Sequence, residues 1–221
     1  MAQKTRPTII RLGVTEGWQS RWFFKKSLKF FLEEDHLIRE ITMEKILQAG
    51  IASIEIERTG DLIRVAIKAS RPGLIIGRGG KGIEELKNLI IRKMKILRHK
   101  NKIPQNFSFN LNVEELKRTE VSAQVIAQQI AFDIERRTPY RTILKRHLES
   151  LKQIKDVKGA KLRLAGRLNG AEISRRDWLA FGRMPLQTLR AVIDYGEATS
   201  FNSYGAVGVK VWIYKGEIFN E

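Results

Sequence analysis

Residues 71–83 read Arg71-Pro72-Gly73-Leu74-Ile75-Ile76-Gly77-Arg78-Gly79-Gly80-Lys81-Gly82-Ile83, a glycine turn that carries basic side chains and leads directly into an amphipathic helix. Glycine lets the main chain approach a phosphate because no Cβ stands in the way. The unpaired N–H groups at the start of the next helix present positive partial charge to an anion. Arg78 and Lys81 add full charges beside them. These features indicate a loop that can hold a phosphate group.

The spacing of the glycines allows several interpretations. Gly77-Arg78-Gly79-Gly80 fits the G-x-x-G loop of a KH domain, which clamps about four nucleotides of single-stranded nucleic acid. The same letters give G-x-G-x-x-G, but a dinucleotide site needs a preceding buried strand and an acidic residue about 20 residues later. Here Pro72-Gly73 leave only a short run in front, and no carboxylate follows Glu85 until Glu114. A Walker loop would need Ser or Thr in place of Gly82. From the loop alone, a KH loop and a plain glycine turn both remain open.

The flanking segments favour the KH interpretation. Apolar periodicity predicts a helix over 20–49, strands over 51–58 and 63–69, a helix over about 81–99 and a strand over 107–113. Helix, strand, strand, glycine-loop helix and strand is the order of a type II KH domain, which we place at 20–115. The acidic cluster Glu33-Glu34-Asp35-His36 is a candidate break in the first helix. We predict no metal site there.

Composition restricts the partner and the class of protein. The chain has 221 residues, enough for two domains, and a formal net charge of +17, which points to a polyanion partner. It contains no cysteine, which excludes disulfides and thiolate zinc sites and suits a reducing cytosol. No apolar run approaches the length of a membrane span, and the N-terminus has no signal-type apolar region, so we expect no membrane partner.

The positive charge is concentrated in three blocks. Lys and Arg outnumber acids by seven to one over 1–30, ten to two over 71–102 and ten to three over 135–163. The intervening residues 31–70 and 103–134 are net acidic. Separate basic blocks indicate several contact surfaces on a large nucleic acid, whereas a uniformly solvated basic surface would not alternate with acidic blocks.

The remaining chain is predicted as an arm and a second domain. Residues 1–19 read as an extended basic arm that orders only against a partner. Residues 116–221 read as a two-layer α+β unit with two helices and about four strands. The predicted elements are helices over about 123–134 and 139–154 and strands over 161–164, 172–181, 189–194 and 206–214, separated by turns at Gly166, Gly170, Gly182, Gly196 and Gly205.

Cationic side chains on this second domain are candidates for RNA contact. The helix over 139–154 carries a basic row with Arg141 and Lys145, next to Arg136-Arg137. The guanidinium of arginine can donate two hydrogen bonds to one phosphate or stack on a base, and adjacent glycines allow the protein main chain to approach the RNA closely. The alternative is that these arginines are strand-edge charges that aid solubility. The candidates for RNA contact are Lys4, Arg6 and Arg11 of the arm, together with Arg136, Arg137, Arg167, Arg175, Arg176, Arg183 and Arg190 of the second domain.

An enzymatic function has little support in the sequence. The three histidines, His36, His99 and His147, are far apart and have no metal-ligand spacing. Glu84 and Glu85 are adjacent on a helix and point to different sides, so they form no acid/base pair. A KH-containing nuclease would need clustered carboxylates for metal ions, and none is found. We therefore predict no catalytic residue, metal or cofactor and no small-molecule substrate. A free-standing RNA chaperone or mRNA-binding regulator remains an alternative.

Several motifs closely resemble those of the bacterial-type small-subunit ribosomal protein S-three family. They follow the family order over nearly the whole chain. The matching segments are residues 10–13 (IRLG), 71–77 (RPGLIIG), 135–137 (ERR), 166–173 (GRLNGAEI), 182–190 (GRMPLQTLR) and 204–212 (YGAVGVKVW).

The resemblance implies a structural constituent of the small ribosomal subunit in the cytoplasm or an organelle matrix. Such a protein binds ribosomal RNA in the subunit head and lines the mRNA entrance, beside proteins S-ten and S-fourteen, with S-four and S-five across the entrance. The family's basic residues that help to open mRNA structure map onto Arg141 and Lys145. A third basic position of the family is Thr142 here, and Thr8-Ile9 replace a more polar pair.

Overall fold

The structure, a computed structural model, describes residues 5–23, 28–46, 49–102, 106–117 and 120–219. Its contacts divide the chain into two compact units. The N-terminal unit is Trp18–Lys117, and the C-terminal unit combines Met1–Gly17 with Arg118–Glu221. Each unit combines helices with a four-stranded sheet, which confirms the predicted α+β fold class. No described helix is long and apolar enough to cross a membrane.

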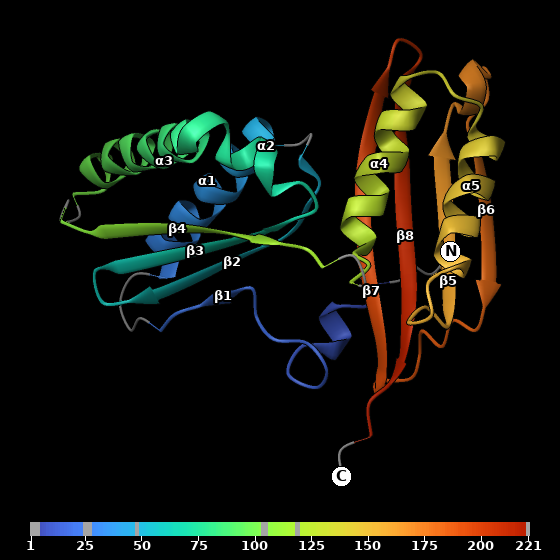
Figure 1. The fold of residues 1–221 in the computed structure, drawn as a ribbon, viewed down its shortest axis with the longest axis horizontal. Helices are drawn as coiled ribbons and strands as arrows, with labels where there is room; N and C mark the ends of the chain where they lie inside the picture. Colours follow the sequence, from blue (N-terminus) through green and yellow to red (C-terminus); the bar gives the residue numbers. More distant parts are fainter. Residues whose placement is uncertain (1–4, 24–27, 47–48, 103–105, 118–119, 220–221) are drawn as a thin grey trace. The chain divides into compact units, whose positions relative to one another are not determined.

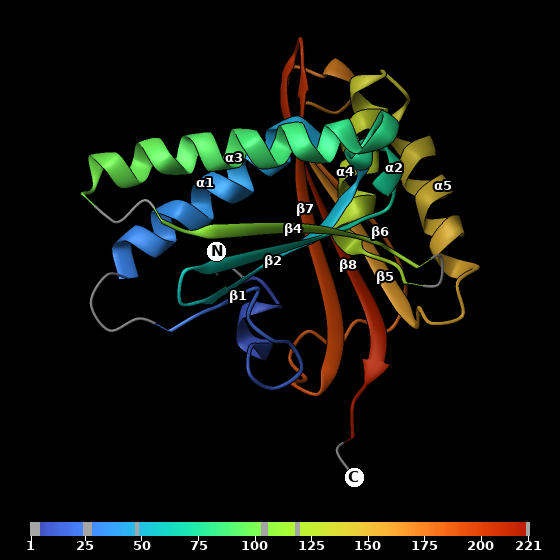
Figure 2. The same cartoon turned by 60° about the vertical axis from the view of Figure 1, so that its left-hand side comes forward.

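The N-terminal unit packs its two long helices on one face of its sheet (Figures 1 and 2). The sheet has the order β1-β2-β3-β4, with β2 and β3 as an antiparallel hairpin and β4 parallel to β3. Its elements are β1 (Ser20–Arg21), α1 (Leu28–Ile46), β2 (Ile51–Thr59), β3 (Leu62–Ala69), α2 (Pro72–Ile76), η3 (Arg78–Gly80), α3 (Lys81–Lys100) and β4 (Ser108–Glu115).

Alternation along the strands builds the core of this unit, as the sequence predicts. Ile54 and Ile56 of β2 are buried, as are Ile63, Val65 and Ile67 of β3. The helices contribute residues three or four positions apart, because these share one face of a helix. The buried helical residues in this core include Ile38 and Ile41 of α1 and Leu86, Ile90 and Met94 of α3.

Two details of the first predicted helix are wrong. Ser20–Arg21 form a short strand that pairs in parallel with Ile56–Glu57, so the helix begins later than predicted. The acidic cluster does not break α1, which runs without interruption from Leu28 to Ile46. Glu34 and Asp35 are instead buried against cations from two other elements.

This buried ion-pair network ties three elements of the unit together. Glu34 pairs with Arg58 of β2 and accepts a 2.7 Å hydrogen bond from Nε of Arg98 on α3. Arg58 Nε also donates to Asp35 at 3.1 Å, and Trp22 Nε1 donates to the same carboxylate at 2.9 Å. The carboxylates can be buried inside α1 because each has charged or N–H donors to replace water.

The C-terminal unit is an antiparallel sheet of order β6-β5-β8-β7 with two helices on one face (Figure 1). Helix α4 lies over β7 and β8, and α5 lies over β5 and β6. The elements are η1 (Ile9–Arg11), α4 (Ala123–Glu135), α5 (Tyr140–Lys152), β5 (Gly159–Gly166), η4 (Leu168–Gly170), β6 (Arg175–Gly182), β7 (Ala191–Asn202) and β8 (Gly205–Glu217).

Strand β7 is longer than the sequence predicts, because Gly196 lies inside it rather than at a turn. Gly196 is buried, and a Cβ at this position would stand 2.3 Å from the carbonyl oxygen of Ala123. The glycine is therefore needed where the start of α4 packs on the strand. Position 196 is therefore a glycine because α4 approaches the strand closely there, and not because the chain turns.

Arg11 corrects the predicted role of the N-terminal arm. Its side chain is fully buried in the C-terminal unit, and its guanidinium is surrounded by main-chain carbonyls. Nε donates to the carbonyl of Ala191 at 2.7 Å and Nη1 to that of Pro7 at 2.8 Å. Nη2 donates to Leu186 at 2.9 Å and to Thr188 at 2.8 Å. Arg11 is thus a structural anchor, and its buried guanidinium is not available to RNA.

Candidate nucleic-acid interface

The glycine loop of the N-terminal unit is exposed and carries two cations. Gly77, Gly79 and Gly80 have φ angles of +69°, +61° and +79°, a region that other residues adopt only with strain. Arg78 and Lys81 are exposed, and Lys81 is the first residue of α3. The N–H groups of the first helical turn and both charges therefore lie at one end of α3, as the sequence predicts.

The glycines of this segment have two separate roles. A Cβ on Gly82 would lie 2.7 Å from the carbonyl oxygen of Ile75, and one on Gly77 would lie 3.1 Å from the nitrogen of Gly82. These two glycines allow α2 and α3 to approach each other. A Cβ on Gly79 or Gly80 would meet nothing within 4 Å. The open side of these two residues is where a phosphate backbone can approach the main chain.

The basic row on α5 is presented away from the core. Ile143, Leu144 and Leu148 of α5 are buried, whereas Arg141 and Lys145 are exposed one helical turn apart. Arg141 Nε donates to the hydroxyl of Tyr140 at 3.2 Å. Thr142, where the family resemblance implies a third basic position, is also exposed.

Other charges of α5 are used within the protein. Arg146 forms an ion pair with Asp133 of α4, and the same carboxylate lies 2.9 Å from Nε2 of the half-buried His147. His147 therefore belongs to the contact between the two helices. The exposed cations Arg141 and Lys145 have no ion-pair partner in the described part of the chain.

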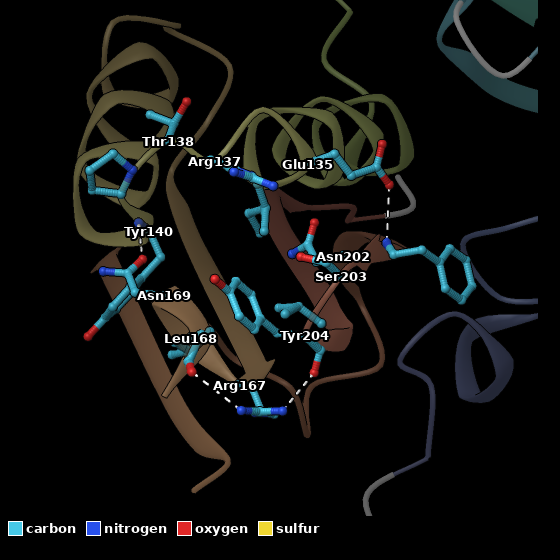
Figure 3. A pocket seen from close by; sticks show the side chains of 15 residues that line it. Glu135, Arg137, Thr138, Tyr140, Arg167, Leu168, Asn169, Asn202, Ser203 and Tyr204 are labelled. Atoms are coloured by element: carbon cyan, nitrogen blue, oxygen red, sulfur yellow. Dashed lines mark hydrogen bonds between the residues drawn. The ribbon is translucent and has the colours of Figure 1, made fainter. Parts of the chain in front are cut away.

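A cavity of about 390 Å³ opens where three segments of the C-terminal unit converge (Figure 3). It is bounded by residues 134–140 at the end of α4, by 167–170 around η4, and by 201–204 at the β7–β8 turn. A second hollow of about 440 Å³ shares Pro139, Tyr140 and residues 168–170 with it and adds Arg141 and Arg175. We call the two together the loop cavity.

The predicted arginines fall into different environments. Arg167 is half-buried, and its guanidinium donates to the carbonyls of Ala171 at 2.9 Å and Tyr204 at 3.1 Å. Arg6 is exposed and paired with Glu197. Lys4 lies outside the described residues. The predicted cations that remain exposed are Arg136, Arg137, Arg175, Arg176, Arg183 and Arg190.

The structure brings some of these arginines together and leaves others apart. Arg137 and Arg167 line the first part of the loop cavity, and Arg141 and Arg175 line the second. Arg183 and Arg190 do not line it. They flank the segment 184–189, whose carbonyls at 185, 186 and 188 accept hydrogen bonds from Arg11.

Sequence reasoning missed the polar and aromatic residues of the loop cavity. Asn169, Asn202, Ser203 and Tyr204 come from two loops about 35 residues apart, and neither loop has a periodic pattern. The available signals are the glycine turns at 166–170 and 205 and the segments 166–173 and 204–212 of the family resemblance, which contain Asn169 and Tyr204 without assigning them a role. Only the pairing of β5 with β8, and of β8 with β7, brings these turns to one end of the sheet.

The face of this sheet carries a further cation between two aromatic rings. Lys161 Nζ lies 4.7 Å from the ring centroid of Trp178 and 5.9 Å from that of Trp212. Trp212 is half-buried against Tyr195, with ring centroids 5.5 Å apart, whereas Trp178 is 55% exposed. Trp178 is therefore an exposed aromatic beside a cation, an arrangement that also suits base stacking.

No metal centre is formed by the described residues, among which no three His, Asp or Glu side chains gather around one point. The titratable groups with perturbed pKa lie away from the loop cavity and the glycine loop. Burial raises the pKa of Glu16 and of Tyr214 and lowers the pKa of Arg11 and Arg39.

Comparison with known proteins gives matches over both units. A family model described as KH domain matches residues 37–121, and one described as Ribosomal protein S3, C-terminal domain, matches 130–213. A relative from Maridesulfovibrio salexigens is 46% identical over 220 residues, covering 100% of this chain and 98% of the relative. One from Thermotoga maritima is 43% identical over 218 residues, covering 98% and 99% respectively. Both are named small ribosomal subunit protein uS3.

Proposed function

The chain belongs to the family of small ribosomal subunit protein uS3, and on that premise we propose that it binds ribosomal RNA and lines the mRNA entrance. Its place of action is the small ribosomal subunit, in the cytoplasm. It is a ribosomal protein with a structural role and not an enzyme. Ribosomal RNA and neighbouring ribosomal proteins are its partners. The specific neighbours that we propose are S-ten and S-fourteen, with S-four and S-five near the entrance.

The open side of the glycine loop is the observation that carries the RNA-binding proposal. Gly79 and Gly80 leave room for a phosphate, and Arg78 and Lys81 stand beside it with exposed charges. A KH loop contacts the nucleic-acid backbone and is therefore suited to single-stranded RNA of varied sequence. The remaining proposed contacts with ribosomal RNA are the exposed arginines of the C-terminal unit and Arg6, together with Lys4. Arg11 and Arg167 support that surface from within.

The row on α5 supports the proposed role at the mRNA entrance. Arg141 and Lys145 are exposed on the same side of the helix, so both can reach phosphates of one strand. A cationic row that binds the unpaired message more tightly than the paired one shifts the equilibrium toward the unpaired form. Thr142 contributes no charge, so the row in this protein depends on two cations.

The glycine loop is tested by comparing charge insertions at matched glycines. The variant Gly79→Asp/Gly80→Asp places carboxylates on the open side of the loop and is expected to weaken single-stranded RNA binding by the full chain tenfold or more. The control is Gly60→Asp, because Gly60 also has a positive φ and nothing within 4 Å of an added Cβ. Equal affinities of the two variants at the same salt concentration would refute an RNA-binding role for the loop.

The mRNA row is tested in ribosomes assembled with Arg141→Ala/Lys145→Ala. We expect slower translation through structured messages and an unchanged rate on unstructured ones. A plot of the logarithm of the binding constant for single-stranded RNA against the logarithm of the salt concentration has a negative slope. Its magnitude is expected to decrease by about 1.4, since each lost phosphate contact removes about 0.7. A matched control is Arg92→Ala/Lys95→Ala on the exposed side of α3. Equal slowing on both kinds of message would contradict the unwinding role.

A further inference from the structure

We propose that the loop cavity receives one unstacked base of a single-stranded RNA, whose flanking phosphates lie over Arg141 and Arg175. This inference rests on the proposed RNA-binding function and assigns it a specific subsite. The cavity of about 390 Å³ is within the range of ligand sites, about 300–1,000 Å³, and is large enough for one nucleoside. Arg141 and Arg175 line the second hollow. An RNA strand that crosses this hollow can place one of its bases in the cavity of about 390 Å³ next to it.

One wall of the cavity is a fixed cation–aromatic surface. The guanidinium of Arg167 is held by the carbonyls of Ala171 and Tyr204, so its plane cannot turn to follow a ligand. The ring of Tyr204 lies 5.8 Å from Arg167 Cζ and is packed over Gly170, where an added Cβ would meet the ring at 3.2 Å. Tyr204 nevertheless remains 56% exposed. An immobilised aromatic ring with an open face is a suitable surface for stacking a base.

The other walls of the cavity supply side chains that can form hydrogen bonds with a base. Asn169, Asn202 and Ser203 line the cavity and are drawn around Tyr204 in Figure 3. The backbone N–H of Tyr140 points to the side-chain oxygen of Asn169 at 3.5 Å. The amide N–H groups of Asn169 have no partner among the described residues. Amides can both donate to and accept from a base, whereas a site for a bare phosphate would need only donors.

Backbone strain is concentrated at the same place. Only three described residues other than glycine have positive φ, and two of them, Arg137 at +61° and Asn169 at +54°, line the cavity. Such conformations are strained for residues other than glycine and tend to occur where side chains are held for a function. Here the two residues bring a cation and an amide to the cavity from two different segments of the chain.

The charge around the opening favours a polyanion strand over a peptide or a free nucleotide. Four arginines line the loop cavity, and the one acid among its residues, Glu135, accepts the backbone N–H of Phe201 at 3.2 Å. A free mononucleotide would fill the base site but would lack the second phosphate that reaches Arg175. An RNA strand uses all of these groups together, so we assign the base to a strand.

The test measures binding of the full chain to an eight-nucleotide single-stranded RNA that contains one 2-aminopurine. Stacking on Tyr204 is expected to change the 2-aminopurine emission. Tyr204→Ala is expected to weaken binding about 5- to 160-fold, which corresponds to the loss of about 1–3 kcal/mol for one stacked base. Tyr204→Phe keeps the ring and is expected to retain binding. The control is Phe219→Ala, because Phe219 is an exposed aromatic of the same unit that does not line the cavity.

Three outcomes would overturn the proposal. One is equal affinity of Tyr204→Ala and Phe219→Ala for the oligonucleotide while the wild-type chain still binds it. Another is competition by adenosine monophosphate as strong as that by the oligonucleotide, since this would identify a nucleotide site. The third is binding of wild-type chain that leaves the 2-aminopurine emission unchanged. Each of these outcomes refutes the base site alone if the variants still sediment with small subunits, because the ribosomal function is then retained. Failure of the wild-type chain to bind any RNA would refute the base site and the proposed RNA-binding function together.

Discussion

Replacing Arg11 by Ala is expected to destabilise the C-terminal unit while leaving the N-terminal unit intact. Arg11 is fully buried, and four of its hydrogen bonds to main-chain carbonyls measure 2.7–2.9 Å. Two of the carbonyls, those of Leu186 and Thr188, belong to the loop between β6 and β7, one belongs to Ala191 at the start of β7, and the fourth belongs to Pro7. The guanidinium therefore fixes both the N-terminal segment and the loop that separates Arg183 from Arg190.

The magnitude follows from what the substitution removes. A hydrogen bond from a charged donor contributes about 1.5–3 kcal/mol, so four would give about 6–12 kcal/mol if they were additive. Removing the side chain also removes the desolvation penalty of a buried cation, several kcal/mol. The net loss is therefore about 3–5 kcal/mol, a large part of the total stability of a domain.

The assay is hydrogen exchange of the full chain at increasing urea, followed by mass spectrometry. Peptides from β7 and β8 report on the C-terminal unit, and peptides from β3 are an internal control. The matched substitution is Arg6→Ala, because Arg6 is exposed and its pair with Glu197 contributes about 0–1 kcal/mol. Equal urea midpoints for Arg11→Ala and Arg6→Ala would refute the reasoning, as would loss of protection in β3.

Three more predictions concern single residues. Glu34→Gln is expected to lower the free energy of unfolding of the N-terminal unit by about 3–5 kcal/mol in urea titrations, because it breaks a buried ion pair. Burial raises the folded-state pKa of Glu16 above its unfolded value. Stability therefore falls as the pH rises through the interval between these two pKa values, and Glu16→Gln should flatten this part of a pH–Tm curve. Gly82→Ala is expected to cost about 1–3 kcal/mol in thermal unfolding, because the new methyl meets the Ile75 carbonyl, whereas Gly73→Ala should be nearly neutral.

Elements with a regular pattern were predictable from the sequence. The alternation over 63–69 matches β3 (Leu62–Ala69), and the helical stripe over 81–99 matches α3 (Lys81–Lys100). Failures occurred where a distant contact determined the local structure. Gly196 resembles a turn residue, but the approach of α4 makes it part of a strand. Glu34 and Asp35 resemble a polar break, but Arg58 and Arg98 make them part of a helix.

The candidate site was predictable where its groups are adjacent in sequence. The glycine loop and the α5 row are each contained in a few residues, so their charges and conformation follow from local order. The loop cavity combines segments around 137, 168 and 203, which meet only because the sheet has the order β6-β5-β8-β7. Strand order depends on long-range pairing, and no local pattern reports it.

The role of an arginine in this protein is determined by the number of acceptors that surround it. Arg11 and Arg167 both lie in motifs that resemble the ribosomal family, as do Arg183 and Arg190, and the sequence treats all four alike. A guanidinium has five N–H donors and cannot lose its charge, so when main-chain carbonyls or carboxylates surround it, it stabilises the fold. Arg11 and Arg167 meet that condition. Where such acceptors are few, the donors are left for phosphate. The net charge of +17 therefore overstates the charge available to RNA, since buried arginines contribute to it while they hold exposed ones in place.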